Sequence, residues 1–83
     1  MESKITFYNE EIKKLDAKRV KAQFKSQRTL TSIKATAEKY LKEISQESHS
    51  AFEILKSNLI SLIERVTEDL KSYYELFLVG YFR

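Results

Sequence analysis

The sequence predicts an all-α protein, an antiparallel helical hairpin or coiled coil that assembles into a helical bundle. Three observations support this prediction. The chain contains no proline and a single glycine, Gly80, although strand-and-turn proteins need these residues at their turns. Apolar residues recur at helical spacing over most of the chain. Finally, a chain of 83 residues forms at most one domain, and such a small domain buries only about 60% of its unfolded surface, so it gains from association.

The main apolar stripe begins at Leu30 and follows a repeating 3-4-4 spacing. Eleven residues in three turns give about 3.67 residues per turn, close to a straight α-helix. Ser48 is the one polar residue among its positions, which are Leu30, Ile33, Ala37, Leu41, Ile44, Ser48, Phe52, Leu55, Leu59, Ile63, Val66, Leu70, Tyr74, Phe77 and Tyr81. Such a stripe needs another helix to cover it. We therefore expect a helix-packing interface formed by Leu30, Ile33, Leu41, Ile44, Phe52, Leu55, Leu59, Ile63, Val66 and Leu70.

A second apolar stripe lies near the N-terminus. Its heptad-like spacing predicts a helix from about residue 4, with Ile5, Tyr8, Ile12 and Leu15 on one face. The heptad positions that follow are Arg19, Ala22 and Ser26, so the stripe weakens there. A neighbouring line through Val20 and Phe24 is expected to take its place.

Two polar segments, 26–32 and 45–50, are candidates for turns because they are rich in residues that favour caps over helix interiors. The distribution of charge along the chain distinguishes between the two candidate turns. Residues 13–42 hold ten basic and two acidic side chains, whereas residues 43–83 hold seven acidic and four basic ones. A turn in the first segment would pack two basic stretches together, whereas a turn in the second pairs a basic helix with an acidic one.

We therefore predict one helical domain, 1–83, with a helix over about 4–44, a polar turn at 45–50 and a helix over about 51–79. One alternative remains open, because the 3-4-4 phase runs through the polar turn without a slip. In that alternative, a single helix from about 30 to 79 belongs to a multi-chain coiled coil.

The ends of the second predicted helix carry local signals. Ser50 and Glu53 match the Ser-x-x-Glu capping box that opens a helix. Gly80 suits the position just after a helix, where a left-handed residue is favoured.

Five basic residues with 4-3-4-3 spacing form a stripe on the first predicted helix. The stripe is about 21 Å long at 1.5 Å per residue and consists of Lys14, Lys18, Lys21, Lys25 and Arg28. Such a stripe suits contacts with the phosphates of a nucleic acid or with an anionic membrane surface. The more ordinary interpretation, which we favour, is a solvated face or a pairing surface for the acidic half of the chain. Few aromatic residues are interleaved with it, which argues against stacking on single-stranded bases.

The C-terminal segment is rich in aromatic residues. Eight of the eleven residues from Tyr73 to Arg83 are apolar, which exceeds what the seam of one hairpin hides. Aromatic side chains are common anchors at interfaces. Closure of the core against the first helix is the competing interpretation. The candidate partner-binding residues are Tyr73, Tyr74, Phe77, Tyr81 and Phe82.

The residue types that carry catalysis are scarce. There is no cysteine and one histidine, His49, which is expected to be a turn or cap residue rather than a metal ligand. The chain has neither a glycine-rich phosphate loop nor a Ser/His/Asp set. We therefore expect a non-enzyme without metal or cofactor. No stretch approaches the roughly 18 apolar residues of a membrane span, so a cytoplasmic location is expected.

These observations predict a non-catalytic protein–protein interaction module, such as a small adaptor, assembly factor or chaperone, that acts by helix packing. Its expected partners are further copies of itself, as a dimer or larger oligomer, or another helical protein. The alternative function is binding of nucleic acid through the basic stripe 14–28.

Overall fold

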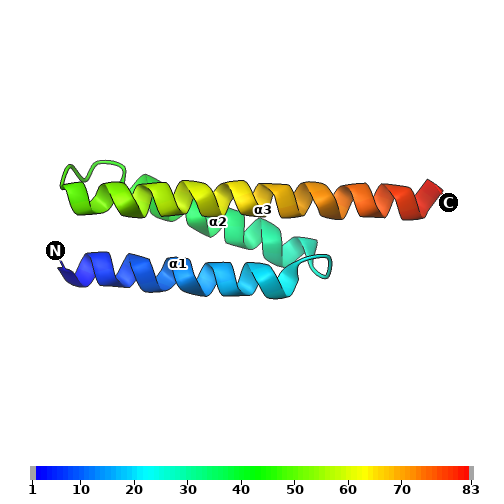
Figure 1. Ribbon diagram of the computed structural model, residues 1–83, viewed down its shortest axis with the longest axis horizontal. Helices are drawn as coiled ribbons and strands as arrows, with labels where there is room; N and C mark the ends of the chain where they lie inside the picture. The colour runs from blue at the N-terminus through cyan, green and yellow to red at the C-terminus, as the bar shows by residue number, and fades with distance from the viewer. Residues whose placement is uncertain (1, 83) are drawn as a thin grey trace.

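The computed structural model describes the backbone of residues 2–82 and the side chains of residues 3–75. Three α-helices account for most of this range: α1 (Glu2–Ala22), α2 (Gln27–Ile44) and α3 (Ser50–Phe82). They run up, down and up, so α1 and α3 are parallel to each other and antiparallel to α2 (Figure 1). Each helix packs against the other two. The all-α prediction is therefore confirmed.

The expected helix over 4–44 is wrong at one place, because the chain turns back between Ala22 and Gln27. Phe24 has a φ of 61°, a left-handed conformation that costs a residue with a side chain roughly 1 kcal/mol. The backbone N–H of Ser26 donates to the carbonyl oxygen of Ala22 at 3.1 Å, which satisfies one of the free carbonyls at the end of α1.

The start of α2 is fixed by a side-chain cap. Ser26 is extended, and its Oγ accepts a hydrogen bond from the backbone N–H of Thr29 at 3.1 Å. A serine in this position typically stabilises a helix by about 1 kcal/mol. Ser26 is the first residue of the polar segment 26–32. The chain therefore turns just before this segment, at 23–26, and the rest of the segment is the start of α2.

The two basic helices pack together because burial of apolar surface outweighs repulsion between exposed charges. Helix α1 buries Tyr8, Ile12, Leu15 and Ala22, and each of the larger side chains contributes roughly 1.5–3 kcal/mol. A like-charge pair at the surface costs only a few tenths of a kcal/mol. Covering the apolar face of α1 therefore stabilises the fold by more than the repulsion between the two basic helices destabilises it.

The buried face of α1 keeps its heptad register to the end of the helix. The side chain of Arg19 is 12% exposed and Ala22 is 5% exposed. Val20 and Phe24, which were expected to take over, are 54% and 60% exposed. This expectation was wrong because a partly buried ion pair between Arg19 and Asp69 lets the heptad line continue through Arg19.

The second turn lies between Ile44 and Ser50. His49 Nδ1 accepts a hydrogen bond from the backbone N–H of Ala51 at 3.1 Å, so His49 caps α3 at the position where a capping box led by Ser50 was expected. At its other end α3 continues two residues past Gly80, to Phe82. The expected end near residue 79 was therefore too early.

The core lies along the axis between the three helices. Seven of the ten predicted packing residues are at most 2% exposed, namely Leu30, Ile33, Ile44, Phe52, Leu55, Leu59 and Val66. The other three, Leu41, Ile63 and Leu70, are partly buried against them. Leu62 is fully buried although the 3-4-4 spacing passes over it, because α3 is covered on two sides and its apolar face is wider than one stripe.

Candidate functional site

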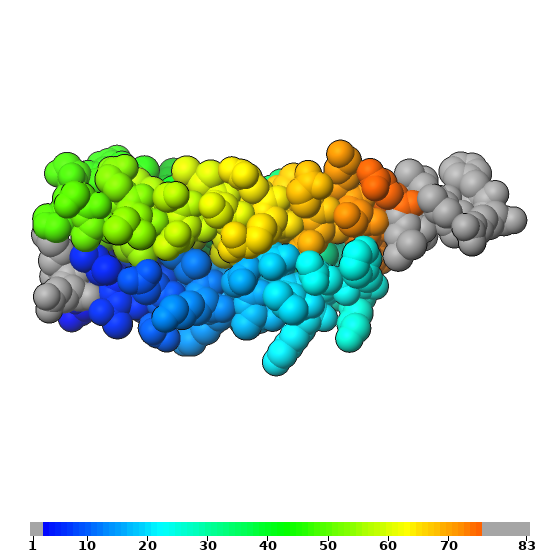
Figure 2. All heavy atoms as spheres, in the orientation of Figure 1, coloured from blue at the N-terminus to red at the C-terminus, as the bar shows by residue number. Residues whose placement is uncertain are grey.

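The chain itself covers most of the stripe that was expected to need a partner. Helices α1 and α2 both lie against α3, and the stripe between Leu30 and Val66 is largely buried in that contact. In Figure 2, α1 and the facing part of α3 touch along the length of α1. The surfaces left for binding are therefore the end of the bundle and its outer faces.

A polar network holds α1 in register beside α3. Arg19 Nη1 lies 2.8 Å from Asp69 Oδ2, and Arg19 Nε lies 2.9 Å from Asp16 Oδ1. Arg65 contacts the same oxygen of Asp16 at 3.3 Å, and Gln23 Nε2 donates to Asp69 Oδ1 at 2.9 Å. The end of α1 is thereby fixed at the level of Asp69.

The charge state of this network follows from its geometry. Partial burial is the largest influence on Asp16 and raises its pKa. The hydrogen bonds and positive charges of Arg19 and Arg65 together outweigh burial, so the pKa lies below its usual value. The Asp16 carboxylate is therefore ionised and accepts hydrogen bonds from the guanidinium groups of Arg19 and Arg65.

Tyrosine–glutamate hydrogen bonds join α1 to α2. Tyr8 donates to Glu43 at 2.9 Å, and Tyr40 donates to Glu11 at 2.8 Å. The two tyrosine rings meet edge to face with centroids 5.5 Å apart. Burial, with a further contribution from Glu43, raises the pKa of Tyr8 to about 12. The two basic helices therefore meet through acidic and aromatic side chains rather than through lysines.

The contact between Tyr8 and Glu43 predicts that the stability of the fold depends on pH in the alkaline range. Because the folded-state pKa of Tyr8 lies above its ordinary value of 10.0, folding favours the neutral phenol. That contribution is complete below about pH 10 and is lost as the pH rises towards 12. We expect urea unfolding to show a steeper loss of stability over this interval in the native protein than in Tyr8→Phe. Parallel losses in both proteins would contradict this origin.

The bundle ends before α3 does. The Gln27 side chain at the start of α2 donates to the Tyr74 hydroxyl, and α1 ends beside Asp69. Beyond Tyr74, α3 continues alone for eight residues, about 12 Å at 1.5 Å per residue, and Figure 1 shows it projecting past the turn between α1 and α2. We call residues 75–82 the α3 extension.

The predicted aromatic residues fall on both sides of this boundary. Tyr73 is half-buried and Tyr74 is 47% exposed, with their rings 6.0 Å apart. Phe77, Tyr81 and Phe82 lie on the helical extension, and their side chains fall outside the described residues. On the bundle side of the boundary, Phe24 in the α1–α2 turn adds another exposed aromatic ring, although the sequence pattern placed this residue on a buried line of α1.

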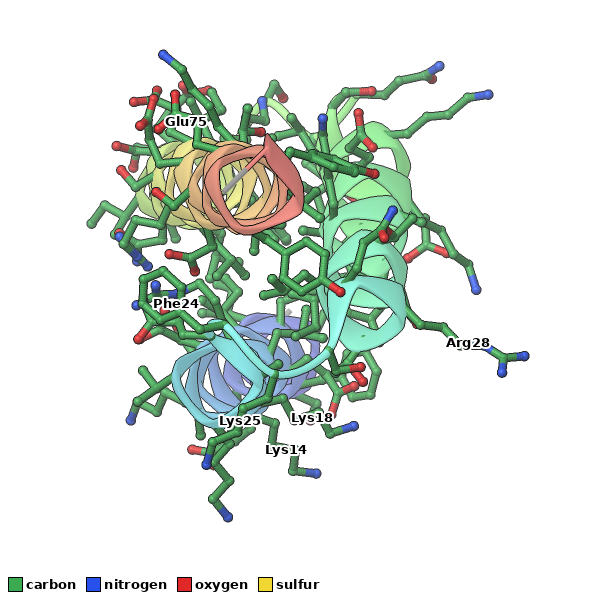
Figure 3. All side chains as sticks on the ribbon, turned by 90° about the vertical axis from the view of Figure 1, so that its right-hand side faces the viewer. Lys14, Lys18, Phe24, Lys25, Arg28 and Glu75 are labelled. Atoms are coloured by element: carbon green, nitrogen blue, oxygen red, sulfur yellow. The ribbon has the colours of Figure 1, made fainter. Side chains whose placement is uncertain are left out.

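The five basic residues do not form one helical stripe as expected. The turn after Ala22 divides them, so Lys14, Lys18 and Lys21 lie on α1, Lys25 lies in the turn and Arg28 lies on α2. All five are exposed. Figure 3 shows Lys14, Lys18 and Lys25 on the side of α1 away from α3, while Arg28 projects from α2.

Turning the chain brings cations from two helices to one groove. The groove lies between residues 11–18 of α1 and residues 28–40 of α2 and has a volume of about 460 Å³. Lys14 and Lys18 line one wall, and Arg28 lines the other. Spacing along a single helix does not reveal this pairing, because it depends on where the chain turns.

Within the described part of the chain, no group of three or more His, Asp or Glu side chains is placed to hold a metal ion. Over the same residues, no helix is both long and apolar enough to cross a membrane. Comparisons with models of known protein families, with curated proteins and with solved structures found no match. What the chain does is therefore inferred from its own surfaces.

Proposed function

We propose that this protein is a non-catalytic interaction module that associates by helix packing, with the α3 extension as its contact surface and a second copy as its partner. The observation that supports the proposal is the mismatch in length between the helices. Helix α1 ends at the level of Asp69 and α2 begins at the level of Tyr74, whereas α3 runs on to Phe82.

The sequence of the extension is the reason to expect that it is covered. Six of its eight residues are apolar: Leu76, Phe77, Leu78, Val79, Tyr81 and Phe82. The helical stripe that is buried up to Val66 continues into it at Phe77 and Tyr81. An apolar helix segment that reaches past its own bundle lowers its free energy by packing against another helix.

A second copy supplies a matching surface through a two-fold axis. Two extensions that lie side by side in opposite directions present the same stripe to each other, as in any isologous contact. The free end of one extension then reaches the other bundle near Tyr74 and Phe24, which are both exposed. Two segments of eight residues bury less than a standard interface of about 800 Å² per partner, so we expect micromolar rather than nanomolar affinity.

The test is the mass of the native protein in solution, measured by sedimentation equilibrium over a wide dilution series. One chain has a mass of 9.8 kDa. We expect at least two chains per particle at high micromolar concentration and dissociation on dilution. A constant mass of one chain over the whole series would contradict self-association. Another helical protein would then replace the second copy as the partner to seek.

A further inference from the structure

We propose that the groove between α1 and α2 is a binding site for the phosphate backbone of a nucleic acid, independent of the α3 extension. Its polar walls are built from the cations Lys14, Lys18 and Arg28 and the hydroxyl side chains Thr29, Ser32 and Thr36. Lysine, arginine, serine and threonine are among the side chains that most often contact phosphate oxygens.

Of the three cations that line the groove, only Lys14 is paired with an acidic side chain among the described residues. Lys18, Lys21, Lys25 and Arg28 form no ion pair with any residue whose side chain the structure describes. Glu11 is the acidic residue in the groove, and it is already held by Lys14 at 3.4 Å and by Tyr40. The hydrogen bond from Tyr40 is the main influence that lowers the pKa of Glu11. Positive charge therefore dominates the groove.

The fold concentrates this charge rather than dispersing it. Residues 2–44 hold eleven basic and six acidic side chains, a net charge of +5, whereas residues 50–82 have a net charge of −2. Figure 3 shows the two sides: Lys14, Lys18 and Arg28 point away from α3, and Glu75 lies across α3 from them. Packing two basic helices together leaves a repulsion that a bound polyanion relieves.

The start of α2 adds to the attraction. The first turn of α2 contains no acidic residue, although the positive end of the helix dipole favours one. Arg28 stands there instead, beside Thr29 in the wall of the groove. Both features raise the electrostatic potential at the same end of the groove and favour an anion.

Shape favours a nucleic acid over a lipid surface. The site is a concave groove, whereas a bilayer presents a broad surface that contacts convex or flat faces. The apolar residues in the groove, Leu15 and Ile33, are 7% and 2% exposed, so neither projects as an anchor into lipid. Lys14 and Lys18 are four residues apart, about 6 Å along α1, which lets them contact different phosphates of one strand.

The experiment titrates the native protein against a fluorescent duplex DNA of arbitrary sequence and follows fluorescence anisotropy. If three phosphates are contacted, binding should weaken roughly 40-fold between 50 and 200 mM salt. Lys18→Gln combined with Arg28→Gln should weaken binding at least about tenfold at low salt. The control, Lys42→Gln with Lys71→Gln, removes the same charge from exposed positions away from the groove and should change affinity much less.

Several outcomes would overturn the proposal. These are no binding at low salt, equal losses in the two double variants, or binding to anionic phosphatidylserine vesicles without binding to DNA. Circular dichroism checks that both variants are folded. Sedimentation of the Lys18→Gln/Arg28→Gln variant separates this site from the α3 extension. Unchanged self-association is expected, whereas a loss of self-association would assign the groove to a second copy and contradict the nucleic-acid site.

Discussion

Replacing Leu59 by aspartate is expected to unfold the protein. Leu59 is fully buried at the centre of the contact between the helices. Its burial contributes roughly 2–3 kcal/mol, and an unpaired buried charge costs about 3–5 kcal/mol more. A chain of this length has a stability of about 4–12 kcal/mol, so most or all of it would be lost. Circular dichroism during urea titration measures the effect.

Ser57→Asp is the matched control for that variant. Ser57 lies two residues away on the same helix and is exposed, so its aspartate stays in water. We expect its unfolding curve to remain within about 0.5 kcal/mol of the native one. Similar curves for the Leu59 and Ser57 variants would show that the register of α3 is wrong.

Replacing Phe77 and Phe82 together by alanine is expected to abolish self-association while leaving the bundle folded. Both residues belong to the α3 extension, past the hydrogen bonds that join Gln23 and Gln27 to Asp69 and Tyr74 of α3. Truncating a buried aromatic anchor commonly costs more than about 2 kcal/mol of binding energy, and micromolar association corresponds to only about 8 kcal/mol. Loss of both anchors moves dissociation to roughly millimolar concentration. Sedimentation equilibrium provides the readout.

Ile54→Ala is the control for the aromatic pair. Ile54 lies at the other end of α3 and is 67% exposed, so its loss should affect neither the mass nor the melting temperature. At dilutions where the native protein is monomeric, the aromatic double variant should melt together with it. Retained oligomers in the double variant would place the contact elsewhere on the surface.

Periodicity and composition predict that the chain is helical and identify most of its buried apolar positions, but not the place where the first predicted helix is broken. Within each helix the apolar line is correct, from Leu30 to Ile44 and from Phe52 to Val66, although it omits Leu62. The turn at 23–26 was not predicted, and a turn in the neighbouring segment 26–32 was disfavoured by its charge, because the charge of a segment does not show which side chains face each other. In the structure, α1 and α2 meet through hydrogen bonds from Tyr8 and Tyr40 to glutamates, and the lysines point outwards. That choice depends on the tertiary arrangement, which no local pattern encodes.

For the candidate surfaces too, the sequence identifies the residues but not their arrangement in space. The residues of the aromatic segment and the basic stripe are evident from composition, but their arrangement is not. Arg28 opposes Lys14 and Lys18 across a groove only because the chain reverses after Ala22. The α3 extension likewise exists only because α1 and α2 together are laid against the first part of a longer helix. Both features follow from the position of one turn.

The distance between spin labels at positions 3 and 53 tests that turn most directly. The chain has no cysteine, so Ser3→Cys and Glu53→Cys give two unique, exposed labelling sites. Lys4 lies 5.8 Å from the centre of the Phe52 ring, so the labels should be less than about 25 Å apart, roughly two helix diameters. Labelled chains are diluted with unlabelled ones to remove distances between copies. A distance near 60 Å, as expected for an unbroken helix over 4–44, would contradict both the fold and the two surfaces built on it.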